Sequence, residues 1–420
     1  MSRRALLKAG AGVGLAIPFG GLLAACGSSG GGGETPILNS FFTLNNVYYH
    51  TYNESSRSAM RKFDMSYHVA VSNEDQSAQR SALEAAGAQG IKGVTMISSS
   101  EAIEPQLMRI LNTEKIYVCN MWNNAPWSVP SEIGPYYTTY GVVNGPKTFE
   151  AVAEILFEKM GGKGKVIQLN GILGVSIDTE RLAGVDAAAK KFPEIDIVTT
   201  RPGGWSRTVA QPVIQDLLVQ YPDVEGIICH NDDMAIAVIA ALRQKGLNKK
   251  VIVVSGDGVP EALKLMQSGD LYATLATHPG WLGGHFVSRL YDALNGWEPK
   301  PAERMIHWGC FVLDTPEAAK EYEKVMYKGT FPYDWKKMSH TLNPDSWEPG
   351  NLVVPFDPAS YWAHRENEKP DGYELPEEYD EPHWKQEMEE VAKEWKDHFT
   401  NDPLTPVRDL CTKKGAEIIV

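Results

Sequence analysis

Between residue 36 and about residue 312 the chain alternates short apolar runs with longer amphipathic stretches, and this alternation is the strongest constraint on its fold. Several runs are continuous, and turn or capping residues bound each of them. Short continuous runs are typical of strands buried on both faces, as in parallel sheets. The runs are 66–71, 93–97, 116–119, 165–169, 195–198, 226–229 and 251–254.

The stretches between these runs predict helices, because apolar residues recur at helical spacing over 149–160, 209–218 and 234–242. Glycines follow the first and the third of them as stop signals, and Ser206 precedes the second as a cap. Alternating strands and helices predict doubly wound α/β sheets. One sheet does not easily hold all these strands, so we expect two lobes, divided near residues 140–145, with a cleft between them.

The chain changes character after about residue 314. Its last ninety residues are rich in proline and acidic residues, and hold Trp335, Trp347, Trp362, Trp384 and Trp395. So many tryptophans argue against disorder. We expect an aromatic-rich arm that packs over the lobes, with a strand near 352–356 and an acidic helix over 381–399.

The first 26 residues predict an export signal rather than part of the fold. Arg3 and Arg4 precede an apolar stretch that is too short and too glycine-rich for a membrane span. This start resembles a twin-arginine signal, and Leu-Ala-Ala-Cys at 23–26 resembles a bacterial lipoprotein cleavage box. By that resemblance Cys26 carries lipid, and residues 27–35 form a flexible tether. The alternative is a plain signal peptide with a chance cysteine.

Composition and motifs exclude several functions. The net charge of −13 argues against nucleic acid as a partner, since phosphate binding needs basic patches. We find no phosphate-loop, His-Glu-x-x-His or Gly-x-Ser-x-Gly motif and no cysteine or histidine cluster with metal-ligand spacing. We therefore expect no enzyme, no cofactor and no metal. An exported oxidoreductase is the rival hypothesis, and it would need a dinucleotide or metal site.

The cysteines after the leader divide into two pairs. Cys119 and Cys229 lie in apolar runs, where cysteine behaves as a small hydrophobic residue. Cys310 and Cys411 are compatible with a disulfide after export, but the sequence does not decide whether they pair.

Polar and aromatic residues gather at the ends of the predicted strands, where ligands bind in doubly wound sheets. In chain order these segments are Thr-Leu-Asn-Asn-Val-Tyr-Tyr at 43–49, Glu-Arg-Leu-Ala-Gly-Val at 180–185, Gly-Trp-Ser-Arg at 204–207, His-Asn-Asp-Asp-Met-Ala at 230–235, Val-Val-Ser-Gly-Asp-Gly at 253–258 and Ala-Thr-Leu-Ala-Thr-His-Pro at 273–279. In this order and spacing they resemble the ribose-type periplasmic sugar-binding proteins, over about two thirds of the chain.

The resemblance implies a type I periplasmic binding protein fold with three hinge crossings. Residues 36–141 and 278–304 would form the N-terminal lobe, and 142–277 and 305–315 the C-terminal lobe. Residues 316–420 would be an extension. The implied function is an extracytoplasmic, lipid-anchored solute-binding protein that delivers a sugar or polyol to an ABC permease. A sensor lobe that reports ligand to a membrane receptor would use the same fold.

The resemblance also implies the ligand-binding residues. Arginine is a fixed fork of donors, aspartate a bidentate acceptor, asparagine offers both, and aromatic rings cover the apolar faces of sugars. The expected contacts are Asn46, Tyr48, Tyr49, Trp122, Asn123, Arg181, Trp205, Asn231, Asp257 and Thr277.

Several of these positions depart from the family pattern. Trp122 and Asn123 stand where the family has an Asp-Arg pair, and Thr277 stands where a ribose binder has glutamine. Loss of the charged pair favours a larger, flatter or less polar ligand than ribose. Asn231 and Asp257 also have an alternative structural interpretation: Asn231 as a helix N-cap and Asp257 as a turn-forming residue.

Overall fold

The computed structural model describes residues 34–365, 369–379 and 382–420. The predicted export signal, Cys26 and most of the tether lie outside the described residues. The first strand, β1, begins at Thr35, the last position of the predicted tether.

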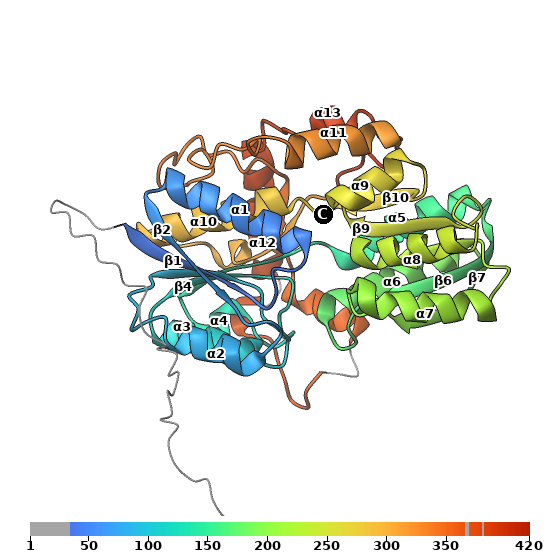
Figure 1. Cartoon of the computed structure of the whole chain (residues 1–420). Coiled ribbons are helices and arrows are strands. Elements are labelled where there is room, and N and C mark those ends of the chain that lie inside the picture. The colour runs from blue at the N-terminus through green and yellow to red at the C-terminus, as the bar shows by residue number, and fades with distance from the viewer. Residues whose placement is uncertain (1–33, 366–368, 380–381) are drawn as a thin grey trace, which may run out of the picture. The chain divides into compact units, whose positions relative to one another are not determined.

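The N-terminal lobe contains a seven-stranded sheet in the order β2-β1-β3-β4-β5-β11-β13 (Figure 1). All neighbouring strands pair in parallel except β13, which is antiparallel to β11. The strands are β1 (Thr35–Phe41), β2 (Met65–Val71), β3 (Gly93–Met96), β4 (Tyr117–Met121), β5 (Tyr137–Val142), β11 (Met305–Trp308) and β13 (Val353–Pro355).

The C-terminal lobe contains a six-stranded sheet in the order β7-β6-β8-β9-β10-β12, with only β12 antiparallel to its neighbour. The first five strands of each lobe therefore follow the same doubly wound order, with the second strand outside the first. The strands are β6 (Lys163–Asn170), β7 (Glu194–Pro202), β8 (Gly226–Cys229), β9 (Ile252–Asp257), β10 (Ala273–Ala276) and β12 (Phe311–Leu313).

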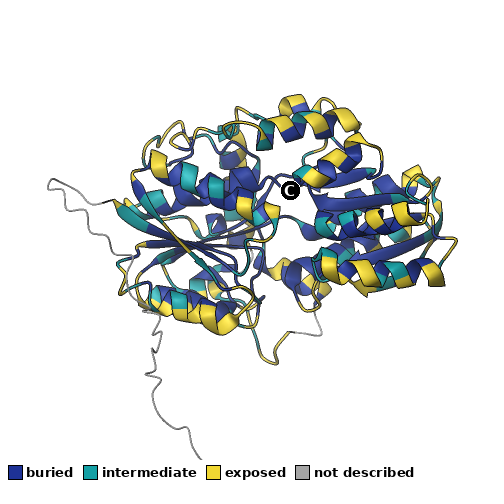
Figure 2. Cartoon of the chain, viewed as in Figure 1, coloured by how far each residue is buried: buried dark blue, intermediate teal, exposed yellow. Residues whose placement is uncertain are grey.

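Helices cover both faces of each sheet, and their exposed sides point away from the buried strands (Figure 2). In the N-terminal lobe, α1 (Val47–Lys62) and α10 (Pro279–Leu294) pack together on one face, and α2 (Gln76–Glu84), α3 (Glu104–Thr113) and the short α4 (Pro130–Ile133) lie on the other. In the C-terminal lobe, α5 (Gly145–Lys159) pairs with α6 (Ser176–Lys191), and α7 (Arg207–Gln220), α8 (Asp232–Gln244) and α9 (Pro260–Gln267) form the second layer.

The three predicted helices are confirmed within α5, α7 and α8. Ser206 occupies the cap position of α7 as expected, but its hydroxyl bonds to Thr208 Oγ1 at 2.9 Å rather than to a backbone N–H.

The chain crosses between the sheets after β5, after β10 and after β11, and the extension crosses once more between β12 and β13. The predicted boundary at residue 304 was wrong, because β11 pairs with β5 and so belongs to the N-terminal lobe. Only β12, from the predicted 305–315 segment, joins the C-terminal sheet. The segment 122–140, in which the sequence patterns predict no strand or helix, holds α4 and the start of β5.

The extension contacts both lobes. Its first helix, α11 (Pro316–Tyr327), packs on α9, and β13 adds a strand to the N-terminal sheet. Trp281 in α10 donates its indole N–H to the carbonyl of Pro349 at 2.7 Å, and Lys414 makes an ion pair with Glu154 in α5. The remaining elements are η1 (Pro301–Glu303), η2 (Pro358–His364), η4 (Glu377–Tyr379), α12 (His383–His398) and α13 (Thr405–Arg408).

The expected strand near 352–356 and the helix over 381–399 are confirmed by β13 and α12. Cys119, Cys229, Cys310 and Cys411 are all free thiols. Within the described ranges, no helix is both long and apolar enough to cross a membrane.

Gly283→Ala should destabilise the N-terminal lobe by about 3 kcal/mol or more, at the upper end of overpacking costs. A Cβ at Gly283 would lie 2.3 Å from the carbonyl oxygen of Tyr52, so α10 and α1 would have to separate. Urea unfolding measures the loss. Gly280→Ala in the same helix is the control, because its Cβ would meet only the side chains of Met326 and Phe331, which can shift. If both variants lose the same free energy of unfolding, the close approach of α10 to α1 at Gly283 does not determine the stability of the lobe.

Candidate ligand-binding site

The predicted site residues lie on loops and helix starts at the carboxyl ends of strands in both lobes. In the N-terminal lobe, Tyr48 and Tyr49 occupy the first turn of α1 directly after β1, and Trp122 follows β4. In the C-terminal lobe, Arg181 lies in α6 after β6, and Asp257 ends β9. Two facing sheets thus bring to one region side chains that are far apart in sequence.

Aromatic rings surround the guanidinium of Arg181. Its Cζ atom lies 5.4 Å from the ring centroid of Trp205, 4.7 Å from that of Phe149, and 5.8 Å from that of Trp122 in the opposite lobe. The Trp122 ring in turn packs edge-on against Tyr48, with centroids 5.7 Å apart. The arrangement joins rings from both lobes around one cation, as cation–π attraction favours.

A chain of buried polar groups orients Arg181. Asp178 accepts hydrogen bonds from the backbone N–H of Gly171 at 2.6 Å and from Asn170 Nδ2 at 2.8 Å, and its Oδ1 lies 2.6 Å from His230 Nδ1. The carbonyl of His230 accepts a hydrogen bond from Arg181 Nη1. Burial raises the pKa of Asp178, but the hydrogen bond and charge of His230, together with the bonds from Asn170 and Gly171, outweigh burial and hold the pKa below its ordinary value.

Asp257 is the buried acceptor of the site. Burial raises its pKa well above the ordinary value, and the Asp232 carboxylate raises it further, although Arg181 lowers it. Among the described residues, no side-chain donor makes a hydrogen bond to this carboxylate. A buried carboxylate without such a donor is costly and invites one from a ligand.

Three of the predicted residues have left-handed backbone conformations that bulky side chains rarely adopt. Their φ angles are 63° at Trp122, 57° at Trp205 and 133° at Asp257. Such conformations cost free energy and tend to cluster at functional sites. Trp205 also lies against Gly171, where a Cβ atom would come within 2.0 Å of the indole, so only glycine fits beneath the ring.

Buried polar atoms in both lobes have no hydrogen-bond partner in the part of the chain that the structure describes. Those that belong to the predicted site residues are Tyr48 Oη, Trp122 Nε1 and Arg181 Nε, and the first two approach each other. These residues are 3%, 6% and 3% exposed, so water does not freely reach them. Native proteins rarely leave such groups unpaired. A polar molecule bound between the lobes would satisfy them.

The predicted asparagines and Thr277 are engaged with the protein in this conformation. Asn46 accepts from the N–H of Tyr48 at 2.7 Å and donates to Asp233 of the opposite lobe at 2.9 Å. Asn231 caps α8 by accepting a hydrogen bond from the backbone N–H of Met234 at 3.0 Å, in agreement with the predicted role as a helix cap.

The other two residues hold loops in place. Asn123 donates to the carbonyl of Ser98 at 2.7 Å, and Thr277 donates to the carbonyl of Asp257 at 3.3 Å. The structure therefore gathers Tyr48, Tyr49, Trp122, Arg181, Trp205 and Asp257 around one region and uses the others to position them.

Comparison with known proteins identifies the family. The model of the periplasmic binding protein domain family matches residues 37–298. This chain belongs to that family. The match ends before the extension, and it covers the residues that surround Arg181.

Individual relatives agree with this assignment. The D-allose-binding periplasmic protein of Escherichia coli is 33% identical over 159 residues, which are 38% of this chain and half of that protein. The ribose import binding protein of Haemophilus influenzae is 26% identical over 66% of this chain and 91% of its own. The solved twin-arginine translocation pathway signal protein from Burkholderia phytofirmans is 26% identical, with a TM-score of 0.67, and the match covers 71% of this chain and 95% of that one.

Sequence reasoning missed several residues of this periplasmic binding protein site. Phe149 begins one of the predicted helical stripes, and Trp308 lies outside every predicted apolar run. The Trp308 ring packs edge-on against Trp122 with centroids 5.3 Å apart, and its indole N–H donates to the carbonyl of Thr277 at 3.1 Å. His230 was only a neighbour of Asn231 in sequence. None carries a local signal, because each acquires its role through contacts distant in the chain.

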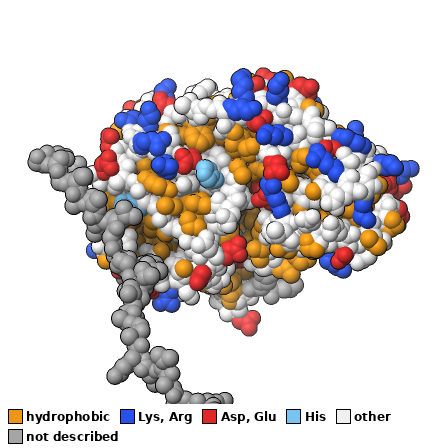
Figure 3. Space-filling view, viewed as in Figure 1, with side chains coloured by type: hydrophobic (Ala, Val, Ile, Leu, Met, Phe, Trp, Pro, Cys, Tyr) orange, Lys and Arg blue, Asp and Glu red, His pale blue; other side chains and the backbone are white. Residues whose placement is uncertain are grey.

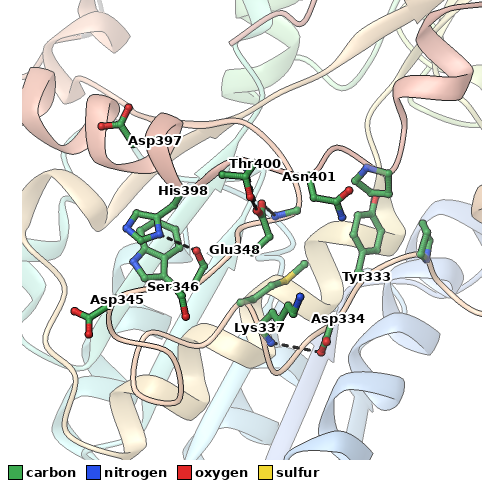
Figure 4. Close-up of a pocket in the computed structure, with 15 residues that line it drawn as sticks. Tyr333, Asp334, Lys337, Asp345, Ser346, Glu348, Asp397, His398, Thr400 and Asn401 are labelled. Atoms are coloured by element: carbon green, nitrogen blue, oxygen red, sulfur yellow. Dashed lines mark hydrogen bonds between the residues drawn. The ribbon is translucent and has the colours of Figure 1, made fainter.

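A cavity of about 510 Å³ lies within the extension, between residues 332–350 and 397–403 (Figure 4). Its polar side chains already bind one another: Glu348 accepts from the hydroxyl and the N–H of Thr400 at 2.6 and 2.9 Å, and His398 Nδ1 lies 2.8 Å from the carbonyl of Trp347. The cavity is therefore a seam that ties two parts of the extension together.

Charge and metal chemistry add little to the site. The face seen in Figure 3 intersperses basic, acidic and apolar side chains. Within the described ranges, no group of three or more His, Cys, Asp or Glu side chains is placed to hold a metal ion.

Asp257→Asn should make the ligand-free protein more compact at neutral pH. Because the pKa of Asp257 is raised in this conformation, protonation favours the closed form, which is most stable at low pH and loses stability as pH rises through that pKa. The wild type should therefore be more compact at pH 5 than at pH 8, and the variant similarly compact at both. Small-angle scattering measures the radius of gyration, with Glu194→Gln on the exposed surface of β7 as control. An unchanged pH response in the Asp257 variant would contradict the prediction.

Proposed function

We propose that this chain captures a sugar or polyol between its two lobes and presents it to an ABC-type permease. The observation that carries the proposal is the gathering of buried polar side chains from both lobes, Tyr48, Trp122 and Arg181, near the buried acceptor Asp257. A polyhydroxylated ligand offers acceptors and donors at once, which this set requires.

The aromatic residues fit the same ligand class. Sugars expose C–H faces that rings cover, and their hydroxyls suit a planar guanidinium and a carboxylate. Two relatives are named for the sugars D-allose and ribose, which supports a small carbohydrate as the ligand of this chain. Trp122, Asn123 and Thr277 replace family residues that contact ribose, so we propose a ligand that is larger, flatter or less polar than ribose.

Closure follows from ligand contacts on both sides. The three crossings between the sheets act as hinges, and a ligand that bonds to both lobes binds the closed form better and shifts the population toward it. The protein performs no chemical step on the ligand in this proposal. A permease would recognise the closed form.

We also propose that the protein is held outside the cytoplasm by lipid on Cys26. The twin arginines and the cleavage box precede a glycine-rich segment, and the family is one of extracytoplasmic proteins. A lipid anchor keeps a binding protein near its permease without a membrane-spanning helix.

The binding proposal predicts a ligand-dependent rise in melting temperature. A screen of the full chain against D-ribose, D-allose, L-arabinose, D-galactose, xylitol and myo-inositol should show stabilisation by at least one, since a ligand of the folded state raises its stability. Asp257→Ala should weaken that ligand at least about tenfold by calorimetry, the cost of losing hydrogen bonds to a charged group. Glu194→Gln, on the exposed surface of β7, serves as the control. Wild-type affinity in Asp257→Ala would place the ligand elsewhere.

The anchoring proposal predicts that Cys26→Ser releases the protein from membranes. After expression in a bacterial host, the wild type should sediment with the membrane fraction and carry a lipid-modified N-terminal cysteine by mass spectrometry. Ser28→Ala, two residues further on, is the control. Retention of the Cys26 variant at the membrane would argue against a lipid anchor.

A further inference from the structure

The helix that carries Arg181 begins without a capping residue of its own. The cap position of α6 is Val175, whose side chain has no acceptor, and Ser176 is the first helical residue. The first N–H groups of a helix need partners from outside it. Asp178, in the first turn, is occupied by Gly171, Asn170 and His230.

The missing cap comes from the opposite lobe. Glu101, in the loop after β3, accepts a hydrogen bond from the backbone N–H of Ser176 through Oε1. Ser176 is 1% exposed and Glu101 is 8% exposed, so the bond is shielded from water. A carboxylate at a helix N-terminus is also favoured by the helix dipole.

The extension supplies the charge that balances Glu101. Arg365 directly follows η2, which packs against α6, and its Nη1 donates to Glu101 Oε2 at 3.1 Å. The Arg365 and Glu101 side chains are 4% and 9% exposed. Burial raises the pKa of Glu101 above its ordinary value, and the charge of Arg365 and the bond from Ser176 offset part of that shift, so both support the ionised form that can accept both bonds.

Three parts of the chain thus meet at one carboxylate: the N-terminal lobe through Glu101, the C-terminal lobe through Ser176, and the extension through Arg365. We propose that Glu101 is an interlobe helix cap that forms only when the lobes close, with Arg365 as its positioning residue, so that the extension stabilises the closed state. The inference rests on the proposed hinge closure and assigns a function to a segment beyond the family match.

The cap would act directly on the ligand site. Residues two and five positions beyond Ser176 are Asp178, which orients His230, and Arg181, which His230 holds. Ordering the first turn of α6 therefore orders the guanidinium. Closure of the lobes therefore also orders Arg181. Part of the free energy of closure then comes from the bond between Glu101 and Ser176 rather than from the ligand.

The test measures the ligand-free full chain, so it does not depend on which ligand binds. Spin labels at Arg80→Cys in α2 and Val219→Cys in α7, with Cys26 and Cys411 replaced by serine, report the distance between the lobes. Glu101→Gln and Arg365→Met should each shift the distribution toward longer distances. The control is Lys393→Ala, which removes an exposed ion pair with Asp397 in the same extension and should change nothing.

Hydrogen exchange separates the cap from a general loss of stability. Glu101→Gln should speed exchange at least about tenfold in peptides that cover the first turn of α6, while α5 and α8 exchange as in the wild type. In the double variant, Arg365→Met should add little to Glu101→Gln, because it acts through that residue. Unchanged distances and exchange in Glu101→Gln would overturn the cap, and additive effects would overturn the positioning role of Arg365. A successful sugar screen with a failed cap test would leave the binding function standing.

Discussion

The structure depends on keeping a guanidinium and a carboxylate dry between two sheets. Arg181 loses hydration on burial, which lowers its pKa, and Asp257 and Asp178 oppose that shift. Paired charges in such a setting need good geometry and further hydrogen bonds to offset their desolvation. The bonds from Asp178 through His230 supply part of this for Arg181. Among the described residues, Asp257 accepts a backbone hydrogen bond from Asp232 but none from a side chain, so its carboxylate is less fully paired than that of Asp178.

The described residues around Asp257 fix its position but provide no side-chain hydrogen-bond donor for its carboxylate. Asp232 accepts from Ser255 Oγ at 2.5 Å, Thr274 Oγ1 at 2.7 Å and the N–H of Val259 at 2.8 Å, and so ties together three segments near the ends of β8, β9 and β10. Its pKa is raised to about 6 by burial despite these bonds. The charge of Asp232 also raises the pKa of Asp257. The residues that fix the loop after β9 therefore disfavour the ionised form of Asp257 unless a donor binds to it.

The extension gives this protein links between its lobes beyond the three crossings. It begins on α9, adds a strand to the N-terminal sheet and returns to the C-terminal lobe through Lys414. Its tryptophans lie buried in the seams, where large rings remove much apolar surface from water. Because the extension contacts both lobes, the free energy of moving one lobe relative to the other includes these contacts as well as the three crossings.

Sequence patterns predicted elements where burial imposes a local pattern. The run at 226–229 coincides with β8, because a strand buried on both faces must be apolar throughout. By contrast, β5 begins with Tyr137, Thr138 and Thr139, and because of this mixed composition it is absent from the predicted apolar runs. The lobe to which β11 belongs was also misjudged, since strand pairing joins residues more than 160 positions apart.

By itself, the sequence determined the alternation of strands and helices, the two-lobed plan and most residues around Arg181, because periodicity, caps and strand-end motifs are local properties. Only the tertiary structure decided that Asn46 bonds to Asp233, that Trp308 backs Trp122, and that Glu101 caps a helix of the other lobe. Those contacts join segments that approach one another only after both sheets have formed, so no short stretch of the chain encodes them.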